Sequence, residues 1–427
     1  MRNSASAAAA TRLTLAGSIS LVAWGALAWQ SHTRGAPLGW ALATLALAWA
    51  ALAAALPGPA ARDAKTIAIF GLGFRLVALF ARPTLEDDHY RFLWDGYRFA
   101  TTGNPYVEAP QASFGDATVP AAFREILDRI NHPDVPTIYG PLTQWAFRFC
   151  HAVAPGKLWP WKLVLLGAEL AIVALLWREL TARGRLLLTW CPLAIFETGF
   201  NAHPDALAIA LLVAAWWLGR RAWSGAAGVA IGLAMAAKVF AVLLAPFILW
   251  RLRRRGWVVA AATAILLYVP FWLRGSAADF AGLRAMAGEW EFNSSVYAVA
   301  AWLVSPAVAH GICGLAFGAI WLAIFLRWMR TNRESLPPGE WVYGGFLLLS
   351  AVANPWYALW LWPFVAMRPS ATGIAALAAV SLAYVTGLNL GAPSLGNFGH
   401  PGWLRPVEFG LVGCGALLDW RKSRTRP

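Results

Sequence analysis

Residues 65–96 read KTIAIFGLGFRLVALFARPTLEDDHYRFLWDG, an apolar run followed by a charged one. The apolar part, 65–81, approaches the length of about 20 residues that an α-helix needs to cross a bilayer. The charged part follows almost at once and contains three consecutive carboxylates, Glu86, Asp87 and Asp88. The stretch therefore predicts a membrane helix that delivers an acidic segment directly to one membrane surface.

The composition of the whole chain agrees with a membrane protein. Of its 427 residues, 59% are hydrophobic and only 13% are charged, and the mean hydropathy is +0.54. A soluble domain carries roughly 25% charged residues, so these few charges exclude a soluble enzyme, and they also exclude disordered and fibrous classes. We expect an all-α polytopic membrane protein, with residues 1–427 forming one integral membrane domain of about 11–14 transmembrane or re-entrant helices.

Apolar segments recur along the chain, and several are shorter than a standard spanning helix. Such short neighbours predict helical hairpins that need not cross fully. The segments are 13–30, 38–56, 65–81, 161–178, 186–200, 203–219, 223–237, 239–250, 257–273, 306–326, 340–353, 356–367, 371–388 and 405–420.

Short basic clusters lie between these segments and set the orientation. With the N-terminus in the cytoplasm, the inner connections include Arg178–Arg185, Arg251–Arg255 and Arg421–Arg426. Every inner connection is then basic, as the positive-inside rule requires, and both termini are cytoplasmic. The net charge of +14 is thus mainly an orientation signal. Because the basic residues form no continuous patch, nucleic acid is not an expected partner.

Orientation also decides two local ambiguities, and segment length decides a third. Residues 138–154 must be interfacial or re-entrant, because a crossing there would invert every later loop. Residues 223–250 must form a hairpin with Lys238 at its outer apex, which keeps the flanking arginine clusters on one side. The N-terminal apolar run is longer than that of a usual signal peptide, so we expect an uncleaved first helix.

Most of the polar chemistry falls on the outer side. The longest non-membrane stretch, 82–160, is the expected outer catalytic loop and carries nine of the 21 acidic residues; shorter outer loops are expected at about 274–305 and 389–404. Glu169 is read as the one clear mid-helix carboxylate, making a polar contact between helices. The isolated cysteines, Cys150, Cys191, Cys313 and Cys414, are expected to be buried small hydrophobes.

The acidic segment that begins at Glu86 is amphipathic if it is helical. One face then carries Asp88, Arg91 and Asp95, and another carries Tyr90, Trp94 and Tyr97. An interfacial helix would explain the aromatic residues, but such helices favour lysine and arginine beside the lipid headgroups. Neighbouring carboxylates raise each other's proton affinity, which suits a general base.

These motifs resemble those of the glycosyltransferase C superfamily, in particular the bacterial polyprenyl-phosphate-mannose-type transferases. The outer-loop pattern DD-x-[YF]-R-[YF]-x-W-[DE]-G matches residues 87–96, GNPY stands at 103–106 and [IV]-Y-x-P matches 138–141. A helix-end H-x-D, at His203 and Asp205, and a hairpin lysine, Lys238, also match. Gly140 departs from the related pattern, which usually has a second proline, and makes the turn less rigid.

The resemblance implies a membrane enzyme of the bacterial inner membrane. It would move a hexose such as mannose from a polyprenyl-phosphate carrier to a hydroxyl of a lipid or glycan acceptor, at the periplasmic face and with inversion. The membrane lipids are further expected partners.

The resemblance also suggests residue roles. Asp88 is the favoured base, because its spacing to Tyr106 matches the single acid of related proteins, and Asp87 would orient the base or bind the acceptor. Lys238 and Arg91 would bind the donor phosphate, with His203 as a hydrogen-bonding partner. The expected substrate-binding residues are Asp205, Tyr139, His132, Tyr106, Trp356 and Tyr357. Tryptophans such as Trp94, Trp290 and Trp356 would lie in the interfacial belt or stack on sugars.

Other readings remain. A transporter or flippase for lipids or lipid-linked sugars would carry internal repeats and midplane charges, and a non-catalytic assembly partner would tolerate substitution of Asp87 and Asp88. Asp87, Asp88, His203 and Asp205 could ligate a divalent cation if they converged. Their order is not a recognised ligand spacing, so neither a metal nor a cofactor is expected.

Overall fold

The structure is a computed structural model that describes residues 2–33, 38–57, 63–275, 290–331, 336–386 and 400–425, together with positions 60 and 288. Within these residues the fold is helical, with one isolated β-bridge, between Phe292 and Val352. This confirms the predicted all-α membrane class.

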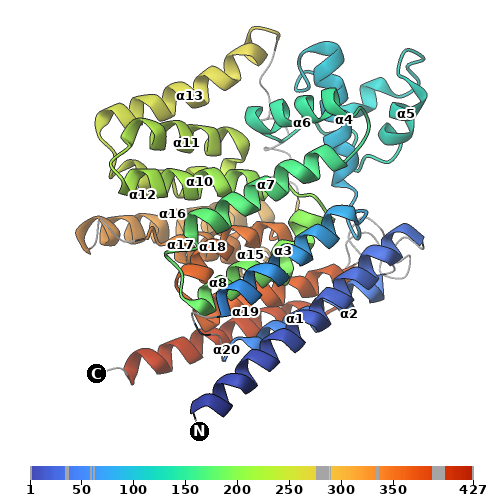
Figure 1. Ribbon diagram of the computed structural model, residues 1–427. Coiled ribbons are helices and arrows are strands. Elements are labelled where there is room, and N and C mark those ends of the chain that lie inside the picture. The colour runs from blue at the N-terminus through green and yellow to red at the C-terminus, as the bar shows by residue number, and fades with distance from the viewer. Residues whose placement is uncertain are drawn as a thin grey trace.

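The helical elements follow one another with short connections (Figure 1). The first half of the chain forms α1 (Arg2–Thr33), α2 (Leu38–Ala55), α3 (Ala64–Phe80), α4 (Asp88–Thr102), η2 (Pro110–Ser113), α5 (Ala121–Leu127), α6 (Pro141–Val153), α7 (Trp159–Leu176), α8 (Ala182–Trp190), α9 (Pro192–Ala194), η3 (Ile195–Phe200) and α10 (Asp205–Arg220). The second half forms α11 (Ser224–Ala237), η4 (Val239–Leu243), α12 (Ala245–Leu249), α13 (Arg254–Trp272), α15 (Val296–Leu303), α16 (Pro306–Thr331), α17 (Gly339–Leu349), η5 (Pro355–Trp360), α18 (Trp362–Met367), α19 (Ala371–Ala379), η6 (Val380–Thr386) and α20 (Leu404–Arg424).

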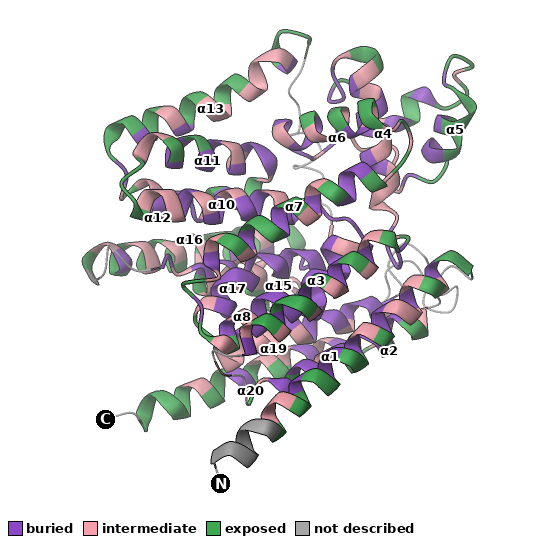
Figure 2. Ribbon diagram, in the orientation of Figure 1, coloured by how far each residue is buried: buried purple, intermediate pink, exposed green. Residues whose placement is uncertain are grey.

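Five of the described helices, α1, α2, α7, α13 and α16, are long and apolar enough to cross a membrane. Protein covers little of this apolar surface in two of them. In the most apolar stretch of α13 only 17% of the residues are buried, and in that of α16 only 11%. Figure 2 shows long exposed stretches along α13 and α16, and Leu315 of α16 is 79% exposed. Exposed apolar surface of this extent requires a lipid environment.

Both ends of the chain lie on one side of the molecule, at the lower left of Figure 1, whereas α4, α5 and α6 lie at the upper right. Between these two ends, helices that are near one another in the chain pack together. Helix α1 contacts α2 and α3, α10 contacts α7 and α11, and α11 contacts α13. This arrangement gathers the 82–160 loop at one end of the bundle.

The acidic segment forms α4, whose aromatic face packs on protein and not on lipid. Trp94 is only 2% exposed and lies in a small core with Tyr97 and the α5 residues Phe123, Ile126 and Leu127. Neither the interfacial belt nor sugar stacking therefore applies to Trp94. The aromatic stripe attaches α5 to α4 and so fixes the outer loop.

The predicted hairpin at 223–250 is confirmed, and one predicted helix is wrong. Helix α11 ends at Ala237, and Lys238 is extended (φ −150°, ψ 132°) before η4 begins. Segment 186–200 is three pieces, because Pro192 cannot continue the hydrogen bonding of α8 and the chain resumes as the π-helix η3. The broken segment brings its last residues to the same end of the bundle as Lys238.

The C-terminal third also differs from the sequence prediction, since segments 356–367 and 371–388 are each divided between a 3₁₀ stretch and an α-helix. The outer loop predicted at about 274–305 contains the helix α15, whose residues 296–303 are apolar enough to pack on α16. Parts of both predicted loops, residues 276–287, 289 and 389–399, lie outside the described residues.

Two sequence predictions about buried groups are tested directly. Glu169 pairs with Arg75 of α3 at 3.1 Å, and both side chains are 2% exposed, which confirms the predicted polar contact between helices. Cys150, Cys191 and Cys313 are buried and unpaired as expected, but Cys414 is exposed on α20, so the prediction of burial is wrong there.

The turn before α6 depends on the glycine at position 140. A Cβ there would overlap the backbone carbonyl of Ala236, because α11 passes directly against the turn. Replacing Gly140 with alanine should lower the free energy of unfolding by about 1–3 kcal/mol, the usual cost of overpacking. Thermal unfolding in detergent measures this, with Gly167→Ala as control because Gly167 has open space around it. Equal melting temperatures for both variants would contradict the close approach.

Candidate functional site

Two short loops with strained backbones form the site. Leu85, just before Glu86, has φ +66°, and Ala202, just before His203, has φ +65°. Such left-handed conformations are unfavourable for non-glycine residues and cluster at functional sites. The backbone N–H of Thr84 donates to Asn201 Oδ1 at 3.2 Å, which ties the two loops together.

Helix α7 holds both loops in place. Lys162 Nζ donates to the carbonyls of Ala78 and Ala81 at 3.1 and 2.5 Å, where α3 gives way to the acidic loop. The neighbouring Trp161 donates through Nε1 to the carbonyl of Ala202 at 2.8 Å. Two adjacent residues of the spanning helix α7 therefore fix the positions of both loops.

Asp88 begins α4 and lies at the centre of the site. Asn131 donates to Asp88 Oδ1 at 3.1 Å, and the hydroxyl of Tyr139 is 3.4 Å from Oδ2. His203 Nε2 is 3.6 Å from the same Oδ2. Burial raises the pKa of Asp88, but His203, Asn131 and Lys238 outweigh burial and lower the pKa to about 2, so the increase expected from the neighbouring carboxylates is wrong for Asp88. Its side chain is 20% exposed, so an ionised carboxylate faces an opening.

His203 lies between two carboxylates. Its Nδ1 is 2.6 Å from Glu197 Oε2, and its ring stacks on Trp356 with centroids 4.1 Å apart and an angle of 14°. Burial lowers the pKa of His203, but Glu197 and Asp88 together raise it to about 9. The hydrogen bond with Glu197 thus fixes the orientation of the imidazole, and the stack on Trp356 fixes its plane.

The lysine at the hairpin apex lies on the other side of Tyr139. Lys238 Nζ pairs with Asp205 Oδ2 at 3.0 Å, and Asp205 Oδ1 also accepts from Trp360 Nε1 at 2.7 Å. The ammonium lies 5.9 Å from the ring centre of Tyr139 and 5.6 Å from that of Tyr357. The lysine side chain is 12% exposed and that of Asp205 is 0% exposed. The ammonium is therefore partly accessible, whereas its carboxylate partner is fully buried.

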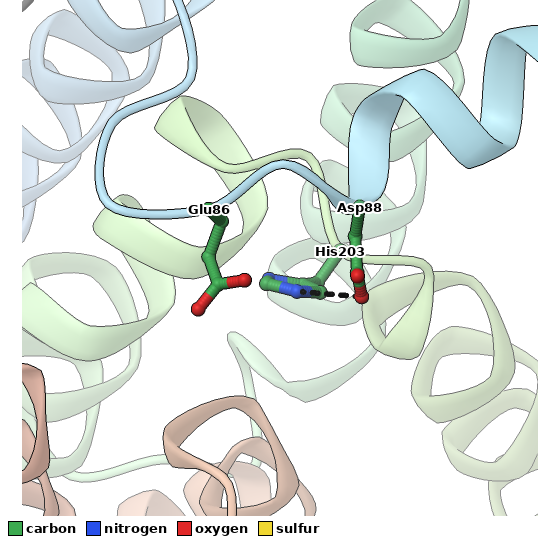
Figure 3. Close-up of side chains that lie close together, drawn as sticks. All are labelled: Glu86, Asp88 and His203. Carbon is green, nitrogen blue, oxygen red and sulfur yellow. Dashed lines mark ion pairs between the residues drawn. The ribbon is translucent and has the colours of Figure 1, made fainter. Parts of the chain in front are cut away.

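Glu86 approaches from the acidic loop. Figure 3 shows its carboxylate and that of Asp88 on either side of the His203 ring. Glu86 is 1% exposed, and neither carboxylate oxygen has a hydrogen-bond partner in the described part of the chain. Burial raises its pKa well above the ordinary value, and the charge of Asp88 raises it further.

The structure brings together most of the residues predicted from the sequence. Asp88, Tyr139, His203, Lys238, Asp205, Trp356 and Tyr357 form one connected set through the contacts above. Asp87 joins through Asn131, which donates to its Oδ1 at 2.7 Å.

Three other predicted residues, Arg91, Tyr106 and His132, make different contacts. Arg91 pairs with Asp95 at 3.0 Å and donates to the carbonyl of Val135. The hydroxyl of Tyr106 donates to the carbonyl of Tyr139 at 2.8 Å. His132 stacks on Trp290 with centroids 4.2 Å apart.

The sequence prediction missed four participants, namely Glu86, Asn131, Glu197 and Trp360. Glu197 carried a usable signal, because it is a lone carboxylate in the apolar run 186–200, and Glu169 was therefore not the only mid-helix carboxylate. Glu86 and Asn131 stand beside motif residues and could have been included with them. Trp360 is one of 26 tryptophans and had no distinguishing signal.

The arrangement combines an ionised, partly exposed carboxylate with a presented ammonium and flat aromatic surfaces. A carboxylate can take a proton from a hydroxyl, an ammonium can bind a phosphate, and aromatic faces pack well against the apolar faces of ring-shaped ligands. These parts suit the transfer of a group between a phosphate ester and an alcohol.

Comparison with known proteins gives one match. The model of the family described as "Alpha-(1->6)-mannopyranosyltransferase, N-terminal domain" matches residues 3–254, which is more than half of the chain. No curated protein and no solved structure matches it. The matched region contains both loops, Asp88, His203 and Lys238.

Proposed function

The chain belongs to the alpha-(1->6)-mannopyranosyltransferase family, and from that premise we propose that it transfers mannose from a polyprenyl-phosphate carrier to an acceptor hydroxyl at the outer membrane face. That it is a membrane mannosyltransferase follows from the family and the spanning helices. The carrier, the face and the mechanism are the proposal. Its main support is the position of Asp88, an ionised and partly exposed carboxylate that lies close enough to Lys238 for the ammonium to help lower its pKa.

The proposed reaction is a single displacement. The acceptor oxygen attacks the anomeric carbon, and Asp88 takes its proton. The bond from that carbon to the phosphate oxygen breaks, and polyprenyl phosphate leaves with the electron pair. Because the leaving group is already a stable anion, the reaction needs positive charge beside it and no acid. A displacement that gives an α-linked product must consume a β-linked donor.

A lipid-linked donor accords with the place of the site. The acidic loop begins directly after the apolar helix α3, and Lys238 stands at the end of α11. A carrier lipid in the bilayer would bring its phosphate to this level without leaving the membrane. The acceptor, either a lipid or a glycan, would approach Asp88 from the exposed side of the loop.

The outer face is supported by the sidedness of the bundle. The loop elements α4, α5 and α6 lie at the end opposite both chain termini (Figure 1). The basic clusters of the sequence, such as Arg251–Arg255, support a cytoplasmic location for the termini under the positive-inside rule. The bacterial inner membrane is the corresponding location.

The test is transfer of radiolabelled mannose by purified protein in lipid vesicles. We expect label from polyprenyl phosphate β-mannose, but not from the α-anomer or a soluble nucleotide sugar, to become covalently attached to acceptor in membrane extract. Nuclear magnetic resonance of the product should show an α-linkage. Transfer from a nucleotide sugar would contradict the carrier, and movement of label across the membrane without a covalent product would indicate a transporter.

A further inference from the structure

Glu86, Asp88 and His203 form a compact cluster of ligand-type atoms. Each side chain offers one oxygen or nitrogen, and these three atoms lie within 4.8 Å of one another. The separation of His203 Nε2 and Asp88 Oδ2 is 3.6 Å, too long for a hydrogen bond. It is, however, the spacing of two neighbouring ligands on one cation with bonds of about 2.1 Å.

The orientation of His203 adds a second observation. Its Nδ1 is 2.6 Å from Glu197 Oε2 and so donates its proton there. Nε2 faces the oxygen of Asp88 and has no hydrogen-bond partner in the described residues. Without a positive charge between them two lone pairs would face each other, and either a proton on Nε2 or a bound cation that displaces this proton can supply that charge. Metal-binding histidines are held by a carboxylate in this same way.

The third observation is Glu86. Its carboxylate is 1% exposed, has no partner at either oxygen in the described residues, and points toward the His203 ring (Figure 3). Burying an unpartnered carboxylate is unfavourable unless a cation or a proton neutralises it. Glu86 thus supplies a free carboxylate oxygen within 4.8 Å of the ligand atoms of both Asp88 and His203.

We propose that Glu86, Asp88 and His203 bind one divalent first-row cation, Mn²⁺ or Zn²⁺, with Glu197 orienting the histidine. Two carboxylate oxygens and one imidazole nitrogen are the donor set that these ions share. This replaces the set weighed from the sequence, because Glu86 takes the place of Asp87 and Asp205. The latter two are committed elsewhere, to Asn131 and to Lys238.

The bound ion would have open positions toward the exposed side of Asp88. There it would lower the pKa of a coordinated acceptor hydroxyl, whose proton Asp88 then takes, or neutralise the arriving phosphate. Only this role rests on the proposed function, because binding of the ion depends on the three side chains alone.

The experiment measures binding without any donor or acceptor. Purified protein in detergent is stripped with chelator and titrated with Mn²⁺, and free Mn²⁺ is followed by its electron paramagnetic resonance signal, with Zn²⁺ as competitor. We expect one saturable site in the wild type. Glu197→Gln should weaken it by roughly 10–100-fold, the range for partners of metal-bound histidines, and Glu86→Gln by at least as much.

Glu125→Gln is the matched control, because Glu125 is an exposed carboxylate on α5 of the same loop. The control should bind Mn²⁺ as the wild type does. Thermal unfolding of Glu86→Gln without metal should match or exceed the wild-type temperature, since a neutral amide replaces a buried carboxylate. No saturable site, or equal affinity in Glu86→Gln and Glu125→Gln, would overturn the proposal. Either result leaves the transfer assay above to judge the proposed function separately.

Discussion

Asp88→Asn should lower the rate of mannose transfer by about 10²–10⁴-fold, the usual contribution of a general base. The amide has the size and shape of the carboxylate but cannot accept the acceptor's proton. It can still accept a hydrogen bond from Asn131 or Tyr139, the two donors near Asp88. The loss should therefore fall on kcat, with a small change in the KM for the lipid donor.

The measurement is transfer of label from the polyprenyl-phosphate donor in vesicles, at saturating donor, for purified variants of equal thermal stability. Asp128→Asn is the matched control, because Asp128 is an exposed aspartate of the same loop. Asp87→Asn should lose less than Asp88→Asn, since the hydrogen bond of Asp87 to the site runs through Asn131 and its carboxylate is not the proposed base. If Asp88→Asn retained near-normal kcat, the assignment of the base would be wrong.

The sequence was sufficient to predict helices where an apolar run is continuous. Segment 65–81 became α3 and 257–273 became α13, with bounds shifted by a few residues. The prediction was wrong where a local backbone rule acts inside an apolar run. Pro192 interrupts 186–200, and the resulting π-helix depends on packing that hydropathy does not describe.

The candidate site was predictable to the extent that its residues stand out chemically. Asp88, His203 and Lys238 were singled out because charged groups next to membrane helices are rare, and the resemblance suggested their roles. Their meeting was not predictable from spacing alone, because Asp88 and Lys238 are linked through Tyr139 of a third segment. The family match supports the activity class and leaves the roles of these residues as predictions.

Buried partners were the hardest part to predict. Glu197 is read in sequence as part of an apolar segment, and its function depends on the histidine that follows the Ala202 turn. Arg91 shows a limit of the motif itself. It stands in the acidic motif, yet its guanidinium pairs with Asp95 and with the Val135 carbonyl. A motif identifies which residues matter but not which way each side chain points.

Lys238→Met should reduce kcat/KM for the lipid donor by about 10²–10³-fold, the effect of removing one group that stabilises charge in a transition state. Lys238 is the partly exposed cation of the site, whereas its partner Asp205 is covered. Methionine keeps much of the length and apolar character of the stem, so the tyrosine rings beside it keep their packing. The missing ammonium would leave the departing phosphate without its nearest positive charge.

The single variant also leaves Asp205 buried with Trp360 as its remaining donor, which destabilises the fold. The double variant Lys238→Met, Asp205→Asn removes that uncompensated charge. It should recover the wild-type melting temperature while transfer stays low, because no cation returns to the phosphate. Lys238→Arg should restore part of the activity. Full transfer by the double variant would mean that Lys238 serves only as the partner of Asp205, and the donor phosphate would then have to be bound elsewhere.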